Sequence, residues 1–110
     1  MKNKTLFTVS GAVLLAFAIK ASAADGKAVY ADNCTKCHGD DGKGQTTMGK
    51  RIGARDYTDP KVQDSFTDEQ GFKSIKEGLK KDDKTLMKAY SALSDDDIKA
   101  VIAYMRTFKK

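Results

Sequence analysis

The pentapeptide Cys34-Thr35-Lys36-Cys37-His38 decides how the rest of this 110-residue chain is interpreted. Two cysteines three positions apart lie on one turn of helix, where both thiols can reach the vinyl groups of one porphyrin and form thioether bonds. The histidine that follows comes under the ring, where its imidazole can ligate the iron. The stretch therefore predicts one covalently attached haem c, held through Cys34 and Cys37, with His38 as an axial ligand.

Other chemistries use the same cysteine spacing. A thioredoxin-like redox site places its cysteines where a strand meets a helix, and the sequence around Cys34 has no strand pattern. A zinc site needs four ligands, usually cysteine or histidine, whereas this chain has two cysteines and a single histidine, His38. Two cysteines also cannot form a disulfide framework. The motif therefore favours a covalent haem.

The N-terminal segment, residues 1–23, has the pattern of a secretory signal peptide. Two lysines lie within its first four residues, an apolar stretch covers residues 9–19, and Ala21-Ser22-Ala23 supplies small residues before a cleavage site. An uncleaved membrane anchor is the alternative. However, the apolar run is shorter than the roughly 20 residues that a bilayer needs, and Lys20 interrupts it. We predict cleavage after Ala23 and export to the periplasm, which leaves one domain over residues 24–110.

Removal of the signal peptide also corrects the charge. Without Lys2, Lys4 and Lys20 the chain has 17 basic and 15 acidic residues, a net charge of +2 instead of +5. This small excess argues against nucleic acid as a partner, because proteins that bind nucleic acid usually have a strongly basic stripe. The remaining sequence has no segment apolar enough to span a membrane. A core of this size is marginal without a staple, which a covalent haem would provide, and we expect a monomer.

Two capping boxes mark the starts of two helices. Thr67 with Gln70 and Ser94 with Asp97 each have the hydroxyl and side-chain acceptor at the required spacing. Apolar residues at helical spacing follow each box. These are Phe72, Ile75 and Leu79 in the first helix and Ile98, Val101, Ile102, Met105 and Phe108 in the second.

A third, shorter helix is expected before the haem motif, over residues 25–34, with Asp25 at its start, where the helix dipole favours an acidic side chain. The glycine-rich residues 39–44 after the motif can only form a loop. With helical signals on both sides of this loop and no strand pattern, the sequence predicts an all-α protein.

The position opposite His38 on the iron needs a second ligand. Because His38 is the only histidine, the soft ligand that remains is methionine. Met105 falls at a core position of the last helix, and Met48 follows His38 too closely to reach the other face of the ring easily. Met87 lies in the connection before the last helix, which we expect to be a loop covering the open face. Met87 is therefore the favoured ligand, with Met48 or an open sixth position as alternatives.

Over residues 24–110 the chain resembles the class I cytochromes c. That family has a glycine and an aromatic residue four positions apart before the haem motif, and Gly26 and Tyr30 match them. Val101 and Tyr104 match the pair that these residues meet in the family's C-terminal helix. The resemblance implies the cytochrome c fold, with three to five short helices around one haem and with crossed N- and C-terminal helices.

The resemblance also implies the second axial ligand. Residues 72–78 resemble the helix that precedes the methionine loop in the family, and Met87 aligns with the axial methionine. The chain departs from the family in lacking the prolines that often follow the haem motif and the methionine, and Lys88 stands directly after Met87. We expect less rigid loops and the same ligation.

Two filled axial positions decide the expected chemistry. Iron with His38 and Met87 bound cannot readily take up oxygen or peroxide, so a change of one electron remains. We therefore expect an electron carrier and not an enzyme, exchanging electrons between respiratory partners in the periplasm. Two alternatives stay open. One is a subunit that transfers electrons inside a fixed complex, and the other is a haem protein with a labile sixth ligand that binds small molecules.

Two further groups of residues are expected around the haem. The family often supplies hydrogen-bond donors to the haem propionates from the region that here holds Lys50, Arg51, Arg55 and Tyr57, with Gln45 a weaker candidate. Lysines also flank the haem motif and the proposed methionine loop, where electrons would leave. These are Lys36, Lys43, Lys80, Lys81, Lys84 and Lys88. Such a patch predicts redox partners with acidic docking surfaces.

Overall fold

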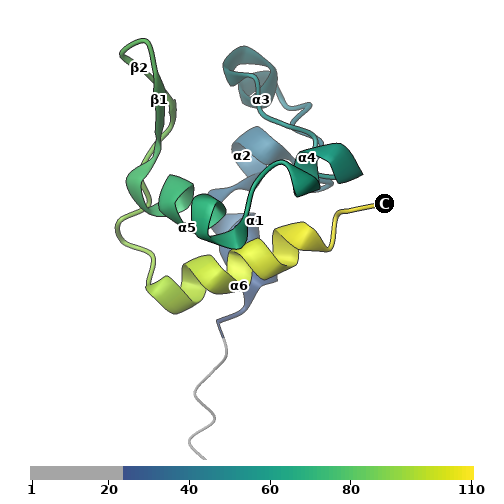
Figure 1. The fold of residues 1–110 in the computed structure, drawn as a ribbon, viewed down its shortest axis with the longest axis vertical. Helices are drawn as coiled ribbons and strands as arrows, with labels where there is room; N and C mark the ends of the chain where they lie inside the picture. The colour runs from purple at the N-terminus through teal and green to yellow at the C-terminus, as the bar shows by residue number, and fades with distance from the viewer. Residues whose placement is uncertain (1–23) are drawn as a thin grey trace, which may run out of the picture.

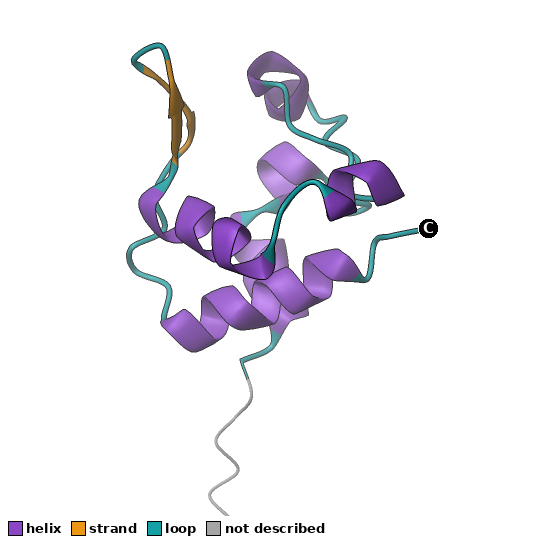
Figure 2. Cartoon of the chain, viewed as in Figure 1, coloured by secondary structure: helices purple, strands orange, loops and turns teal. Residues whose placement is uncertain are grey.

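The computed structural model describes residues 24–110, and the predicted signal peptide, residues 1–23, lies outside them. The described residues form six helical segments and one two-stranded hairpin (Figures 1 and 2). In chain order these are α1 (Gly26–Asn33), α2 (Thr35–His38), α3 (Thr47–Ile52), α4 (Pro60–Asp64), α5 (Asp68–Glu77), β1 (Leu79–Lys81), β2 (Lys84–Met87) and α6 (Asp95–Arg106). No helix among them is both long and apolar enough to cross a membrane.

The first and last helices, α1 and α6, cross at close range, as the family resemblance implies (Figure 1). Asp25 caps the start of α1. The next residue, Gly26, lies directly against the main-chain carbonyl of Ala100 in α6, and a β-carbon at this position would overlap that carbonyl. One turn later the ring of Tyr30 packs on that of Tyr104, with 5.3 Å between centroids. Glycine is therefore required here by the closeness of two helices.

The core lies between α1, α5 and α6. Both predicted capping boxes are present, Thr67 with Gln70 at the start of α5 and Ser94 with Asp97 at the start of α6. They begin the two helices whose apolar faces meet in the core. The buried apolar residues are Tyr30, Ile75, Ile98, Val101, Ile102 and Met105. Met105 is thus a packing residue, as its place in the predicted stripe indicates.

A β-hairpin stands where a loop was expected before Met87. Strands β1 and β2 pair antiparallel in a register that sets Leu79 opposite Met87. Asp82 and Asp83 close the turn with φ of 50° and 61°. Positive φ at both turn residues matches the right-handed twist of the strands, and aspartate tolerates this region better than most side chains. The hairpin projects from the end of α5, away from α6 (Figure 1).

The all-α class is confirmed, and further details besides the hairpin differ from expectation. Phe108 packs against the core but lies beyond the end of α6 at Arg106, so the prediction that it continues the stripe of that helix is wrong. The described residues contain six helical segments instead of three to five, because Cys34 separates α1 from α2 and because α3 and α4 are short independent turns. The prediction that Leu79 continues the apolar stripe of α5 is wrong. The helix ends at Glu77, Gly78 turns the chain at φ 81°, and Leu79 is 44% exposed in β1.

Candidate functional site

The haem motif forms a tight helical turn. Cys34 stands between α1 and α2, and its carbonyl accepts hydrogen bonds from the amides of Cys37 (3.3 Å) and His38 (2.9 Å). A single turn therefore carries both cysteines and the histidine, as their spacing predicts. Thr46 fixes the end of this turn, since its hydroxyl lies within hydrogen-bond distance of the carbonyls of Lys36 (2.7 Å) and Cys37 (2.9 Å).

The two cysteines have the properties of an attachment site. Both thiols are free and half-buried. The pKa of Cys34 rises to about 11, chiefly because the thiol is buried and also because Cys37 lies beside it. The Cys34 thiol is therefore protonated at neutral pH, unlike the thiolate of a thioredoxin-like redox site. Two adjacent free thiols fit a group that is bound through two sulfur atoms.

His38 has the properties of a neutral metal ligand. Burial lowers the pKa of its imidazole, so the uncharged form prevails at neutral pH. Its Nδ1 atom is buried and has no hydrogen-bond partner among residues 24–110. The ring of Tyr57 lies against the imidazole, with centroids 5.2 Å apart and planes inclined by 43°. An uncharged imidazole with an unpaired buried nitrogen fits a metal site better than a structural role.

The glycine-rich loop after the motif folds back onto α1 and α2. The hydroxyl of Tyr30 donates a buried hydrogen bond of 2.6 Å to the carbonyl of Gly39. The amide of Gly44 donates one of 2.8 Å to the carbonyl of His38. These bonds attach the main chain on both sides of the loop to the helical turn that carries the histidine.

Met87, the predicted second ligand, lies at the end of β2. Its half-buried side chain packs against the core cluster, as does Cys34. Gly78 lies beneath the main chain of this segment, and a β-carbon there would come within 2.7 Å of the Met87 carbonyl. The close approach of these two backbones sets the hairpin directly on the end of α5.

Tyr90 fixes the chain that follows Met87. Its amide donates a hydrogen bond of 2.9 Å to the carbonyl of Ile75 in α5, and its hydroxyl donates one of 2.9 Å to the carbonyl of Asn33. Burial raises the pKa of the Tyr90 hydroxyl, and the thiol of Cys34 raises it further. The methionine segment is therefore bonded both to α5 and to the residue that precedes the first cysteine of the motif.

The other two methionines have different surroundings. Met48 lies half-buried in α3, whose first turn is bonded to the haem motif through Thr46. Gly49 presses against the carbonyl of Cys37, which holds α3 directly on α2, the element that carries the histidine. Met105 belongs to the buried core.

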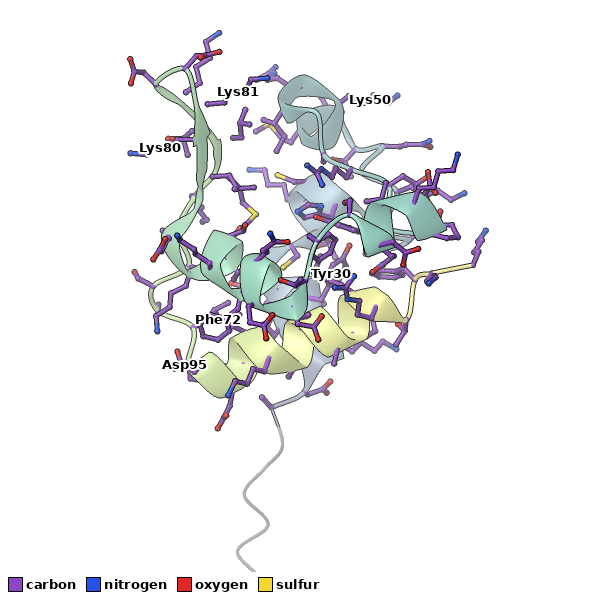
Figure 3. The ribbon with its side chains drawn as sticks, in the orientation of Figure 1. Tyr30, Lys50, Phe72, Lys80, Lys81 and Asp95 are labelled. Carbon is purple, nitrogen blue, oxygen red and sulfur yellow. The ribbon has the colours of Figure 1, made fainter. Side chains whose placement is uncertain are left out.

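The four predicted propionate donors fall into two groups. Lys50 (Figure 3) and Arg51 are exposed on α3. Arg55 and Tyr57 lie in the connection before α4, where Arg55 donates a hydrogen bond of 3.2 Å to the hydroxyl of Ser65. Of the four, Tyr57 is the residue in contact with His38, and burial raises the pKa of its hydroxyl.

The six predicted docking lysines are also divided. The hairpin carries Lys80 and Lys81 (Figure 3) together with Lys84, and all three are exposed. Lys88 follows, with its ammonium 5.1 Å from the centroid of the Tyr90 ring. The haem-motif side contributes the exposed Lys36 and the half-buried Lys43. The strongest concentration of exposed positive charge among the six is on the hairpin.

Three residues that hold the site together were not singled out in the sequence, namely Thr46, Gln63 and Tyr90. Each bonds through its side chain to a main-chain carbonyl that is distant in sequence. A local pattern does not report such bonds. Only Thr46 has a local signal, because it is also the N-cap of α3.

Known proteins share this architecture. The family model described as Cytochrome c matches residues 23–109. Among solved structures, the KustC0563 c-type cytochrome has 31% identity and a TM-score of 0.66, covering 78% of this chain and 99% of that chain. A structure of a tyrosine-to-phenylalanine mutant of Kustc0563 gives 31% identity and a TM-score of 0.66, with 77% and 99% covered. The search of curated proteins found no match. The matched residues include the haem motif, and this chain belongs to the cytochrome c family, for which a covalently bound c-type haem is implied.

Proposed function

We propose that this chain is a periplasmic electron carrier with one haem c, bound through Cys34 and Cys37 and ligated by His38 and Met87. Membership of the cytochrome c family supports a haem-based electron-transfer role. Export rests on the signal-peptide pattern of residues 1–23, which also defines the functional domain as residues 24–110.

The observation that carries the proposal is the attachment of the methionine segment to the haem motif. The hydrogen bond from the Tyr90 hydroxyl to the carbonyl of Asn33 joins the chain three residues after Met87 to the residue before Cys34. This bond supports Met87 as the second ligand over Met48, because Met48 lies on α3, which packs on the histidine-bearing turn.

A haem bound here supplies a reversible one-electron change at iron. The chain's own residues decide how easily that change occurs. A thioether ligand from Met87 is soft and uncharged and favours the ferrous state, which raises the reduction potential. The apolar cluster behind Cys34 and Met87 acts in the same direction, since burial in apolar surroundings disfavours the extra charge of the ferric state.

We further propose that redox partners with acidic surfaces dock beside the hairpin. Lys80, Lys81 and Lys84 extend from it into solvent, and Lys88 follows Met87 directly. Lys36 and Lys43 would complete the basic surface on the haem-motif side. Positive charge close to the electron-exit edge steers acidic partners and favours fast, weak association.

Absorption spectroscopy of the purified protein and its methionine variants tests the proposal. The haem should stay with the polypeptide in acid–acetone, and the ferric form should be low-spin with the weak far-red band of iron–sulfur bonding. Met87→Ala should abolish that band, lower the potential and open the iron to added ligands. Met48→Ala is the matched control and should keep the band.

Three outcomes would contradict parts of the proposal. Extraction of free haem into the organic layer would contradict covalent attachment. Loss of the far-red band in Met48→Ala but not in Met87→Ala would assign the ligand to α3. Rapid carbon monoxide binding by the unaltered ferrous protein would indicate a labile sixth position and a small-molecule-binding role.

A further inference from the structure

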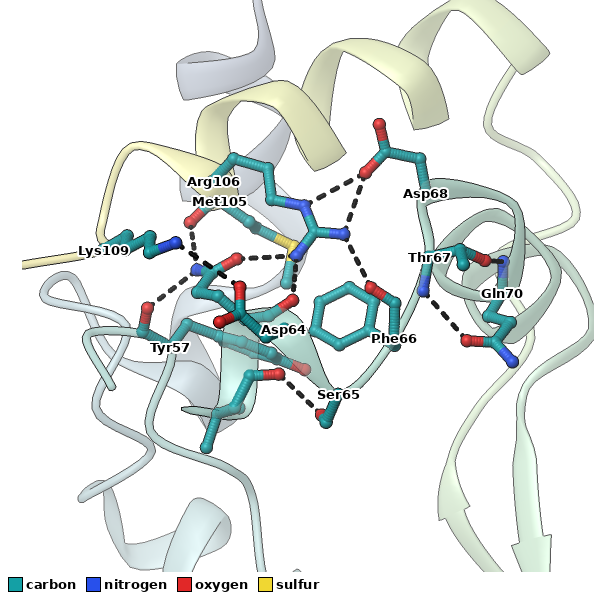
Figure 4. A network of polar contacts seen from close by, with 12 residues as sticks. Tyr57, Asp64, Ser65, Phe66, Thr67, Asp68, Gln70, Met105, Arg106 and Lys109 are labelled. Carbon is teal, nitrogen blue, oxygen red and sulfur yellow. Dashed lines mark hydrogen bonds and ion pairs between the residues drawn. The ribbon is translucent and has the colours of Figure 1, made fainter. Parts of the chain in front are cut away.

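Gln63 is a buried amide side chain, with 3% of its surface exposed, and apart from the Tyr30 hydroxyl it is the one buried polar side chain found in residues 24–110. Its amide nitrogen donates hydrogen bonds to the carbonyls of Tyr57 (2.7 Å) and Met105 (3.0 Å), and its amide oxygen accepts one from Arg106 (2.9 Å) (Figure 4). Every polar group of this side chain is thereby engaged. A buried amide is tolerated only when it is satisfied in this way.

Arg106 anchors the amide of Gln63. Its guanidinium donates to the carbonyl of Phe66 (2.9 Å) and to the carboxylate of Asp68 (3.0 Å), and it stacks on the Phe66 ring with its carbon 4.3 Å from the ring centroid (Figure 4). It also donates to the main-chain carbonyl of Gln63. The last turn of α6 is thus fixed to residues 63–68, and Gln63 has little freedom to turn away.

Tyr57 is held by its main chain on both sides. Its amide donates a hydrogen bond of 2.8 Å to the carbonyl of Gly42, in the loop after the haem motif, and its carbonyl accepts the bond from Gln63. The ring lies between His38, at 5.2 Å, and the edge of Phe66, at 5.9 Å between centroids. The position of the tyrosine ring against the histidine therefore depends on these two main-chain bonds.

We propose that Gln63 is a positioning residue for the histidine side of the haem, acting through Tyr57, and that it connects the end of α6 to that site. The inference rests on the proposed role of His38 as an iron ligand. Gln63 holds the Tyr57 carbonyl, the Tyr57 ring covers the His38 imidazole, and this cover keeps water from the proximal side. An apolar side chain could fill the same space but could not hold the carbonyl.

Gln63→Met, which has nearly the same length and no hydrogen-bonding amide, is the principal test. With Tyr57 released, water gains access to the proximal side and stabilises the ferric state. The reduction potential should fall, and the hyperfine-shifted proton signals of His38 in the ferric protein should move. The matched control is Thr67→Ala, which removes the cap of α5 without touching Tyr57. It should destabilise the protein without moving either signal.

Gln63→Glu separates the two functions of the amide. It keeps an acceptor for Arg106 but loses the donor to the carbonyls of Tyr57 and Met105, so the His38 signals should move as they do in Gln63→Met. In the unaltered protein, nuclear Overhauser contacts between the ring protons of Tyr57 and the imidazole protons of His38 should be present, because the two rings lie 5.2 Å apart. This last measurement needs no variant to fold.

The outcomes separate this inference from the proposed function. If the unaltered protein lacks covalent haem or a low-spin ferric state, the proposed function fails. If that protein behaves as expected but the His38 signals of both Gln63 variants match those of Thr67→Ala, the positioning role alone is wrong. Absence of the contacts between the Tyr57 and His38 rings in the unaltered protein would also overturn it.

Discussion

The hydroxyl of Tyr90 and the main-chain carbonyl of Asn33, 57 residues apart, are joined by a partly buried hydrogen bond of 2.9 Å. Asn33 is the last residue of α1 and precedes the first haem cysteine, while Tyr90 follows the proposed axial methionine. One side chain therefore links the two segments that we expect to contact the haem from opposite faces. Removal of the Tyr90 hydroxyl should therefore disturb the ligation of the iron more than the stability of the fold.

Tyr90→Phe tests this link. The variant loses one hydrogen bond and leaves the Asn33 carbonyl unpaired, which should lower the free energy of unfolding by about 1 kcal/mol. It should also loosen the methionine segment, so the far-red iron–sulfur band should disappear at a lower temperature than in the unaltered protein. Tyr104→Phe is the control, since its hydroxyl makes no hydrogen bond within residues 24–110. Equal band-loss temperatures in both variants would show that Tyr90 does not support the ligand.

Two glycines should respond to alanine in opposite directions. At Gly26 the added methyl group would overlap the Ala100 carbonyl, so Gly26→Ala should destabilise the protein by about 1–3 kcal/mol. At Gly71, inside α5, the methyl group would have ordinary contacts of 3.4 Å with Phe66 and 3.7 Å with Ile102. Gly71→Ala should therefore stabilise the protein by about 0.5–1 kcal/mol, because alanine is the better helix former. Urea unfolding of both holoproteins measures the difference. A Gly26→Ala variant as stable as the unaltered protein would contradict the close helix crossing, and a destabilised Gly71→Ala variant would contradict the open space at Gly71.

Tyr30 should make the protein sensitive to alkali. Burial raises the pKa of its hydroxyl above the ordinary value, and the proton is needed for the bond to Gly39. Because the pKa is raised in the folded state, the contribution of Tyr30 to the free energy of unfolding is fully present below about pH 10. It is lost as the pH rises further, at up to about 1.4 kcal/mol per pH unit.

Tyr30→Phe checks this dependence. At pH 8 the variant should be less stable by about 1 kcal/mol, because the bond to the Gly39 carbonyl is missing. The deficit should shrink or reverse between pH 10 and pH 11, since phenylalanine has no proton to lose. Urea unfolding at pH 8 and at pH 11, followed by far-ultraviolet circular dichroism, measures this deficit in the free energy of unfolding. Lysine titration is common to both proteins, so a constant deficit would exclude Tyr30 as the cause.

The sequence was sufficient for those parts of the fold that depend on local signals. Both capping boxes, the core stripe of α6 from Ile98 to Met105 and the turn that carries the haem motif depend on neighbours within four residues, and all are present. The close crossing at Gly26 was implied only by the family resemblance. Intrinsic helix propensity would have counted that glycine as a weak point.

The hairpin was missed because its sequence has no alternating apolar pattern. Residues 80–84 are all charged, and the strands exist because Asp82 and Asp83 take positive φ and reverse the chain within two residues. The supports of the site were missed for a different reason. Gln63 and Tyr90 bond to main-chain carbonyls that are 42 and 57 residues away, and no periodicity reports contacts over such separations.

If partners dock through the hairpin, the rate of electron transfer should depend on its lysines and on ionic strength. Replacing Lys80, Lys81 and Lys84 by glutamine removes three exposed charges from one projecting element. The rate of electron transfer to an acidic partner should fall about tenfold at low ionic strength, since steering of encounter depends on local charge. In the unaltered protein the same rate should fall steeply as added salt shortens the Debye length below about 10 Å, and the triple variant should depend on salt much less.

A second triple variant separates local from overall charge. Lys27, Lys61 and Lys99 are also exposed but lie on α1, α4 and α6. Changing them to glutamine removes the same net charge away from the hairpin, so the rate and its salt dependence should change little. If both triple variants slow transfer equally, net charge and not the hairpin attracts the partner. If the rate of the unaltered protein is flat or rises with salt, the hairpin is not the docking surface for an acidic partner, because screening can only weaken an attraction between opposite charges.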